Sequence, residues 1–279
     1  MKTCDLHCHS NRSDGSLTPT QLVRLAEEAG LSALALTDHN TTKGLAEFMD
    51  AGKESKTQTV AGCEFSTKYA GKELHIVGLF FPPESWKEVE DYVEFQHIAK
   101  NKSNLQLIEN LRAGGYDISY EEVAAITKAD VFNRNHVARI LLKNKYVESI
   151  YHAFATLLKS GNGYYIPAKK LSSAATIRFI KANGGKAVWA HPFFTMKQAE
   201  EVEEFLPQAK EAGLDAIETV YTTYSPEQTR QAKALAKKYG LLESGGSDYH
   251  GAGKPDISLG VGYGELQVPF SFFEKLRDR

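Results

Sequence analysis

Nine imidazole and carboxylate side chains of this 279-residue chain have the types and the spacing that a catalytic metal site requires. His7 and His9 open the set at the end of a short predicted strand, where side chains two positions apart share one face. The set contains no thiolate, and nitrogen and oxygen ligands favour zinc, manganese or iron held for chemistry over a closed structural zinc site. The candidate ligands are His7, His9, Asp14, His39, Glu64, His75, His191, Asp248 and His250.

The candidates recur where the sequence predicts that strands end. Buried strands are predicted at residues 33–37, 186–190 and 241–245, and a candidate histidine or aspartate follows each of them within a few positions. In a parallel barrel, the carboxyl ends of all strands lie on one rim, where such enzymes place their chemistry. Glu64 and His75 carry less weight alone, because a strand-end Glu is commonly solvated and an alternating strand could simply expose His75.

Strands and helices alternate over most of the chain. Further strands are predicted for residues 73–81 and 215–220, and the helical stretches before the later strands end at glycines. This alternation indicates either a parallel barrel or an open doubly wound sheet. Residues 82–167 interrupt it with helical patterns, so we expect two parts of one barrel domain, residues 1–81 and 168–279, separated by a helical insertion.

Charge is distributed unevenly along the chain. The formal net charge of −2 excludes a generally basic nucleic-acid binder. Residues 97–170 nevertheless hold 11 Lys and Arg against 6 Asp and Glu, a balance of +5, which leaves −7 for the remainder. A basic stretch at residues 97–170 beside an acidic, metal-binding barrel favours an anionic substrate. No apolar run approaches the roughly 20 residues of a membrane span, and without a recognisable signal peptide we expect a cytoplasmic protein.

Motifs spread from Met1 to Gly251 resemble, in order, those of the polymerase and histidinol phosphatase (PHP) superfamily. The resemblance implies an α/β fold, a distorted seven-stranded (β/α)7 TIM-like barrel with a helical insertion, and two or three divalent metal ions. The matching stretches are His7-Cys8-His9-Ser10, Ser13-Asp14-Gly15, Leu36-Thr37-Asp38-His39-Asn40, Gly62-Cys63-Glu64, His75, Ala190-His191-Pro192 and Gly246-Ser247-Asp248-Tyr249-His250-Gly251.

The same resemblance implies how the ligands share the ions. Asp14 stands where many family members have a histidine, and this aspartate is typical of a subgroup with a helical insertion. We interpret Asp38 as a residue outside the ligand set that either is structural or orients a ligand imidazole. In the implied arrangement, the first metal is held by His7, His9, Glu64 and Asp248. The second metal is held by His75, His191 and the same Glu64, which bridges the two ions. The third metal is held by Asp14, His39 and His250.

A stretch of the insertion also resembles that subgroup. Residues 132–139, Phe-Asn-Arg-Asn-His-Val-Ala-Arg, are similar to its Gly-Arg-Pro-His motif, with Asn in place of both the usual Gly and Pro. Arg134 and His136 would then reach the substrate phosphate, Arg134 by paired hydrogen bonds. The alternative is a helix start whose arginine is only solvated.

The resemblance implies a metal-dependent phosphoesterase that hydrolyses a phosphomonoester by attack of a metal-bridging hydroxide. The subgroup is similar to phosphatases that act on nucleoside 3′,5′-bisphosphates and nucleoside monophosphates, so we expect a small phosphorylated substrate, a nucleotide, and no protein partner. A 5′–3′ exoribonuclease acting on short RNA and a histidinol-phosphate-type phosphatase are the alternatives within the family.

Two functions of other classes stay open. An amidohydrolase also begins with His-x-His in a β/α barrel, but it would not require Asp14, Glu64 and the pair Asp248 and His250 together. A non-catalytic, metal-binding PHP module often loses ligands, whereas this chain has kept all nine.

Overall fold

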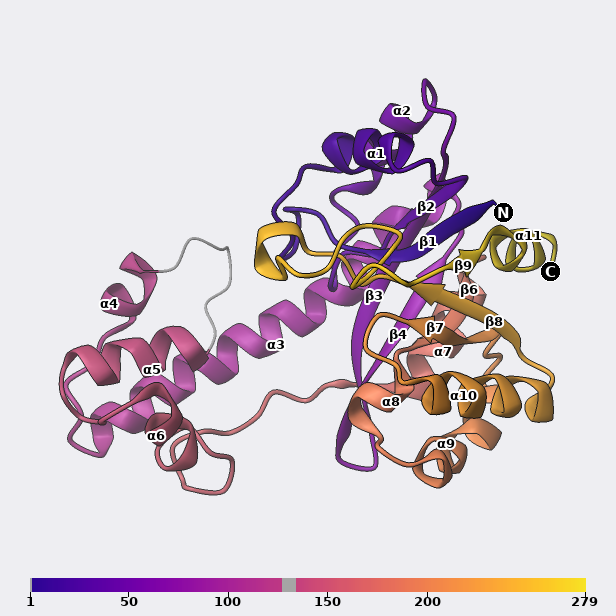
Figure 1. The fold of residues 1–279 in the computed structure, drawn as a ribbon. Coiled ribbons are helices and arrows are strands. Elements are labelled where there is room, and N and C mark those ends of the chain that lie inside the picture. Colours follow the sequence, from indigo (N-terminus) through magenta and orange to yellow (C-terminus); the bar gives the residue numbers. More distant parts are fainter. Residues whose placement is uncertain (1, 127–133) are drawn as a thin grey trace. The chain divides into compact units, whose positions relative to one another are not determined.

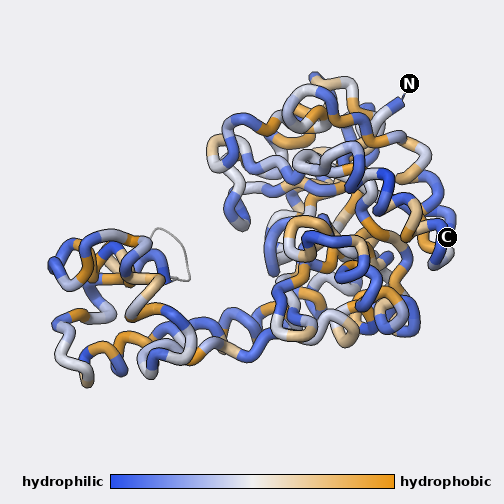
Figure 2. The backbone as a smooth tube through the Cα atoms, turned by 60° about the horizontal axis from the view of Figure 1, so that its bottom comes forward, coloured by the Kyte–Doolittle hydropathy of each residue, from blue (hydrophilic) through white to orange (hydrophobic). Residues whose placement is uncertain are grey.

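The computed structural model describes residues 2–126 and 134–279, which form two compact units (Figure 1). The first unit contains Met1–Val93 and Leu171–Arg279, and the second contains Glu94–Lys170. Helix α3 (Trp86–Ala113) starts in the first unit and continues into the second, and residues 82–93 therefore belong to the first unit. Each unit has its own hydrophobic segments, orange in Figure 2.

The first unit is built on one sheet that almost closes into a barrel, which confirms the predicted α/β barrel class. The sheet runs in the order β8-β7-β6-β4-β3-β2-β1-β9, and the short strand β5 (Leu171–Ser172) pairs with β3. Its other strands are β1 (Thr3–Cys8), β2 (Ala33–Leu36), β3 (Gln58–Tyr69), β4 (Lys72–Leu79), β6 (Lys186–Ala190), β7 (Ala216–Tyr221), β8 (Leu242–Gly246) and β9 (Val268–Pro269).

Hydrogen bonds between β1 and the segment after β8 bring the two ends of the barrel together. The amide of Asp248 donates to the carbonyl of His7 at 2.9 Å, and the amide of His9 donates to the carbonyl of Tyr249 at 2.9 Å. His7 of β1 and His9, which follows the strand, are thus joined by backbone bonds to the segment that carries Asp248.

Strand β4 departs from the parallel arrangement. It forms a hairpin with β3, and it is antiparallel both to β3 and to β6 on its other side. The alternating sequence of residues 73–81 predicts the strand, but strand direction depends on the two-residue turn at Ala70 and Gly71, whose φ angles are 45° and 83°. A tight hairpin leaves no room for the crossover that a parallel pair needs.

Helices cover the sheet, because the strands present apolar side chains toward them. On β2, Leu34 and Leu36 pack under α1 and α2. Ala33 and Ala35 belong to a different apolar cluster, which contains residues of six other strands and of α11. The helices of this unit are α1 (Pro19–Glu28), α2 (Leu45–Gly52), α7 (Ser173–Ala182), α8 (Pro192–Thr195), α9 (Ala199–Glu211), α10 (Pro226–Tyr239) and α11 (Phe270–Asp278), with 3-10 turns η1 (Pro83–Ser85) and η2 (Gly251–Gly253).

In the described part of the second unit, residues 94–126 and 134–170, the continuation of α3 is joined by three shorter helices. These are α4 (Tyr120–Ala125), α5 (Arg134–Lys143) and α6 (Ile150–Ala155), and their apolar residues form a cluster of their own. Ser119 begins α4 with a capping box and Ser149 caps α6. Among residues 2–126 and 134–279, no helix combines the length and the apolar character needed to cross a membrane.

Candidate metal centre

The nine predicted ligands meet in a single region of the first unit. Their nitrogen and oxygen atoms fall into four overlapping groups, and within each group these atoms lie within 4.8 Å of one another. The groups are His7, His9 and Asp248; His7, Glu64 and His191; His39, Glu64 and His75; and His9, Asp14, His39 and His250.

Glu64 is at the centre, and its two carboxylate oxygens face different histidines. Its Oε1 lies 2.8 Å from Nδ1 of His75 and 3.0 Å from Nε2 of His191. Its Oε2 faces the other side, within 3.3 Å of nitrogen atoms of His39, His7 and His9. A fully buried carboxylate with ligands on both sides has the geometry of a group that bridges two cations.

The antiparallel direction of β4 explains why His75 belongs to the cluster. In the ladder, His75 stands opposite Ser66 of β3 and Ala190 of β6, the residue before His191. Because β4 runs against its neighbours, the beginning of this strand lies at the rim where the parallel strands end. The alternation of residues 73–81 alone does not reveal this.

Three residues at or next to predicted ligands have left-handed backbones although none is glycine. The φ angles are 48° for Asn40, 30° for His191 and 56° for Asp248. Such conformations cost free energy and persist where surrounding contacts enforce them. The amide of Asn40 donates to the carbonyl of Glu64 at 2.9 Å, and the amide of Asp248 donates to that of His7. Three of the six left-handed non-glycine residues of the described chain are therefore predicted ligands or the neighbour of one.

Glu218 on β7 is a functional candidate that the sequence interpretation missed. Its Oε1 lies 2.8 Å from Nδ1 of His7, and its Oε2 accepts a 2.6 Å hydrogen bond from the amide of His191. An Nδ1–H directed at this carboxylate leaves Nε2 of His7 free to bind a metal. The available signal was a glutamate inside the apolar run Ala216–Tyr221, since a buried carboxylate requires a partner.

Tyr221 and Lys254, also missed, hold Asp248 from the other side. The Tyr221 hydroxyl and the Lys254 ammonium each donate to Oδ2 of Asp248 at 2.7 Å. The opposite oxygen, Oδ1, lies 3.1 Å from Nε2 of His9. Burial and the charge of Asp248 raise the pKa of Tyr221, so this hydroxyl stays protonated and donates. The two donors fix which oxygen of Asp248 faces the cluster.

Asp38 has the structural one of its two expected roles. Its carboxylate accepts hydrogen bonds from the amide and hydroxyl of Ser10 and from the hydroxyl of Ser13. It therefore orders the loop that leads to Asp14, instead of orienting an imidazole. Asp14 itself is more than half exposed, and its Oδ1 lies 3.2 Å from Nε2 of His250.

Burial and neighbouring charges shift the pKa values of the cluster in opposite directions. Burial, together with the nearby His39, lowers the pKa of His9 to about 3. Burial also opposes charge on His7, but Glu64 and Glu218 outweigh it and raise the pKa of His7. Burial likewise opposes charge on Glu64, and the surrounding imidazoles hold its pKa well below the usual value. Glu64 is thus a carboxylate and His9 a neutral imidazole, the forms that bind metal ions.

The chemistry of these atoms fits divalent ions. Among the described residues, four ring nitrogens and one carboxylate oxygen of the cluster are buried outside hydrogen-bond geometry, although they lie close together. Buried polar atoms without partners are costly, and a shared cation would satisfy them. They are Nε2 of His7, both ring nitrogens of His9, Nδ1 of His39 and Oε2 of Glu64.

Arg134 and His136 lie in the second unit, at the start of α5, and do not belong to these four groups. The Arg134 guanidinium is 4.1 Å from the ring centroid of Tyr165 and donates to the carbonyl of Leu158 at 3.0 Å. Its side chain is therefore packed, not simply solvated. Burial, with Arg139 and Lys100 nearby, lowers the pKa of His136. Phe132 and Asn133 of the predicted motif lie outside the described residues.

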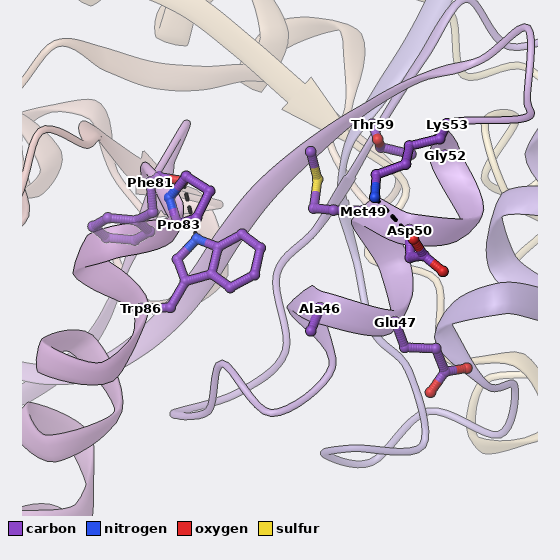
Figure 3. Close-up of a pocket in the computed structure, with 10 residues that line it drawn as sticks. All are labelled: Ala46, Glu47, Met49, Asp50, Gly52, Lys53, Thr59, Phe81, Pro83 and Trp86. Atoms are coloured by element: carbon purple, nitrogen blue, oxygen red, sulfur yellow. Dashed lines mark hydrogen bonds and ion pairs between the residues drawn. The ribbon is translucent and has the colours of Figure 1, made fainter.

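A pocket of about 830 Å³ lies elsewhere in the first unit, between α2 and the start of α3 (Figure 3). Met49, Phe81 and Trp86 supply its apolar walls, and the Trp86 indole donates to the carbonyl of Phe81 at 3.0 Å. None of the nine predicted ligands lines it. The pocket is therefore separate from the metal-ligand cluster.

Comparison with known proteins gives one consistent similarity. The sequence model of the PHP domain family matches residues 5–167. The chain is 32% identical to a 5′-3′ exoribonuclease of Haemophilus influenzae, over 89% of this chain and 90% of that protein. It is 28% identical to a 3′,5′-nucleoside bisphosphate phosphatase of Chromobacterium violaceum, over 93% and 91%. A solved structure from Bifidobacterium adolescentis, assigned to the metal-dependent phosphoesterases, superposes with a TM-score of 0.75, 27% identity and coverage of 99% and 95%.

Proposed function

We propose, from the premise that this chain belongs to the PHP domain family, that it removes a phosphate from a nucleotide with the nine-residue cluster as its metal centre. The chain is a metal-dependent hydrolase of phosphoric esters. Within that activity, we propose a nucleoside 3′,5′-bisphosphate or a nucleoside monophosphate as the substrate, and manganese, iron or zinc as the metal.

The observation that carries the metal centre is the division of ligands around Glu64. Its Oε1 faces His75 and His191, and its Oε2 faces His7 and His9. This division supports Glu64 as the bridge between two ions. In the assignment that we propose, the first ion takes His7, His9, Glu64 and Asp248, the second takes Glu64, His75 and His191, and a third takes Asp14, His39 and His250.

The residues around the ligands prepare them for binding. Glu218 directs Nε2 of His7 toward the cluster, and Tyr221 with Lys254 turns Oδ1 of Asp248 in the same direction. Nδ1 of His250 lies 2.8 Å from the carbonyl of Asp248, which leaves its Nε2 toward Asp14. When bound, divalent ions supply an activated water at neutral pH and neutralise charge on a phosphoryl group.

The choice of a nucleotide rests on the relatives and on charge. Both named relatives act on nucleotides or RNA, according to their descriptions. Residues 94–170 of the second unit hold 11 Lys and Arg against 7 Asp and Glu, an excess of +4 that favours a phosphate. We propose that Arg134 and His136 recognise the substrate from this unit, with Arg134 pairing its guanidinium with a phosphate oxygen.

A substrate panel tests this function. Manganese-loaded protein should be assayed for phosphate release from adenosine 3′,5′-bisphosphate, adenosine monophosphate, a short 5′-phosphorylated RNA and histidinol phosphate. We expect the highest kcat/KM for the two mononucleotides. Equal or faster turnover of histidinol phosphate would contradict the nucleotide assignment. Ammonia release from an amide substrate without phosphate release would favour an amidohydrolase.

The exoribonuclease is the second candidate, and the 32% identity to the Haemophilus influenzae enzyme favours it. It would use the same metal centre to hydrolyse a phosphodiester instead of a phosphomonoester: the mononucleotide leaves, and the attacked phosphate stays on the remaining RNA chain. A higher kcat/KM for the 5′-phosphorylated RNA than for adenosine 3′,5′-bisphosphate, with mononucleotide products, would select it.

A further inference from the structure

Phe194 is an exposed aromatic residue that borders the metal-ligand cluster. It lies on α8, the four-residue helix that begins directly after the ligand candidate His191. The Phe194 side chain is 61% exposed, and its ring centroid lies 5.6 Å from that of His191. An apolar ring is thus placed at the accessible edge of a site that is otherwise made of imidazoles and carboxylates.

The surrounding segment holds this ring in a defined place. Phe193 and Met196, on either side of it, are buried in the core, and the amide of Phe193 donates to the Tyr224 hydroxyl at 3.2 Å. The amide of Phe194 donates to the carbonyl of His191 at 2.8 Å. With its neighbours anchored inward, Phe194 is directed outward by the short helix. Its exposure is a property of an ordered segment beside the cluster.

Single exposed apolar residues are common and by themselves require no function. Two features distinguish Phe194. Among the described residues of the first unit, the large hydrophobic side chains that are exposed are those of Phe194, Val261 and Tyr263, and Phe194 is the one whose ring contacts a ligand candidate. In addition, the Phe194 side chain stays 61% exposed although the Lys197 ammonium lies over its ring, 5.6 Å from the centroid.

We infer that Phe194 is the surface on which the base of the nucleotide stacks while the phosphate lies at the metal centre. The inference rests on the proposed function, and it deepens that function by naming a residue that distinguishes a nucleotide from a base-free phosphate ester. A base and a 5′-phosphate are separated by one ribose, and Phe194 lies next to His191. Every base has an aromatic face, so a single phenyl ring accepts any of them.

The test compares two substrates that differ in the base. Adenosine monophosphate and ribose 5-phosphate carry the same 5′-phosphate on the same sugar, and kcat and KM are measured for both with manganese-loaded wild type, Phe194→Ala and Phe194→Trp. We expect Phe194→Ala to lower kcat/KM for adenosine monophosphate about 5- to 100-fold, mainly through KM, as truncation of a stacking ring does. The value for ribose 5-phosphate should stay within about twofold, and Phe194→Trp should restore use of the nucleotide.

Tyr263→Ala removes an aromatic ring of similar exposure and serves as the matched control, with no expected change. Metal content and Tm, measured for each variant, report on the cluster and the fold. Equal losses on both substrates, or an unchanged kcat/KM for adenosine monophosphate in Phe194→Ala, would overturn the stacking role and leave the proposed function intact. Failure of the wild type itself to hydrolyse nucleotides, with ribose 5-phosphate turned over, would overturn the proposed function and the stacking role together.

Discussion

The two units differ in how their polar residues are arranged. In the first unit, strands from distant parts of the sequence end at one rim and bring nine metal-binding side chains into four overlapping groups. In the second unit, short helices pack around their own apolar cluster, and Arg134 rests against Tyr165. A sheet closed into a barrel makes strand ends converge, whereas helices distribute their polar residues over separate faces.

The same contrast holds for the backbone. The first unit has left-handed residues at His191 and Asp248, beside the cluster, where hydrogen bonds hold them. In the second unit, Lys145 is the left-handed non-glycine residue among those described, and it lies in the turn that follows α5. Left-handed backbone thus accompanies candidate ligands in the first unit and a turn after a helix in the second.

The largest effect is expected at the centre of the first unit. Glu64→Gln replaces a carboxylate that faces ligands on both sides, so metal content should fall and kcat/KM should drop at least about 100-fold, because a catalytic ion is worth several kcal/mol. Elemental analysis and phosphate release measure the two quantities. Glu201→Gln, which removes a surface carboxylate bonded to Lys72, should match the wild type. Full activity of Glu64→Gln would refute the bridge.

Glu218→Gln tests the interaction that orients the candidate ligand His7. The amide keeps the shape of the side chain but loses the charge that faces His7, so metal affinity should weaken about 10- to 100-fold, with activity recovered at high manganese. Metal titration followed by kinetics at saturating manganese measures this. Glu243→Gln is the matched control, because its carboxylate accepts from Thr219 instead of a ligand. Equal metal affinity in Glu218→Gln and the wild type would remove the positioning role.

Arg134→Ala tests the second unit's part in recognition. If Arg134 pairs with the phosphate, the variant should lose about 1.5 to 3 kcal/mol of transition-state binding, or about 10- to 150-fold in kcat/KM, with metal content unchanged. Arg139→Ala, on the same helix, is the control. Because Arg134 also packs on Tyr165, Tm is measured as well. A lower Tm with unchanged kcat/KM would make Arg134 a structural residue of its own unit.

Metal binding should depend on pH through His75. Burial lowers the pKa of His75, but Glu64 and Glu73 outweigh it and raise the pKa to about 10. The metal-free protein therefore holds this imidazole protonated at pH 7, and binding must displace the proton. Affinity should rise with pH between 6 and 8, by up to about tenfold per unit for each proton released. Calorimetry in two buffers counts the protons, and an affinity that falls with pH would contradict the sign.

The smallest effects are expected for the histidines outside the cluster. His97 pairs with Glu94 one helical turn away, and the His152 ring accepts from the amide of Glu148. His97→Ala and His152→Ala should each keep kcat/KM within about twofold and bind the same number of ions, because local surface contacts contribute little. Steady-state kinetics and elemental analysis measure this. A large loss in either variant would show that the second unit also contributes to the chemistry.

The sequence predicted much of the centre because strand ends and ligand types are local features. His39 and His191 follow apolar runs that read as strands, and the runs are strands β2 and β6. The place of His75 at the rim could not be predicted in the same way, because it depends on the antiparallel direction of β4. Direction is set by a hairpin and by neighbours that lie far away in the sequence.

By itself, the sequence determined which side chains are candidate ligands, where the main strands lie along the chain, and that helices occupy much of the described part of residues 82–167. The tertiary structure alone decided which oxygen of Glu64 faces which histidine, and that Glu218 and Lys254 hold His7 and Asp248. The physical reason is distance along the chain: His7 and Glu218 meet only when the barrel closes. A carboxylate within an apolar strand indicates that a buried partner group must exist, and only the packed structure identifies that group.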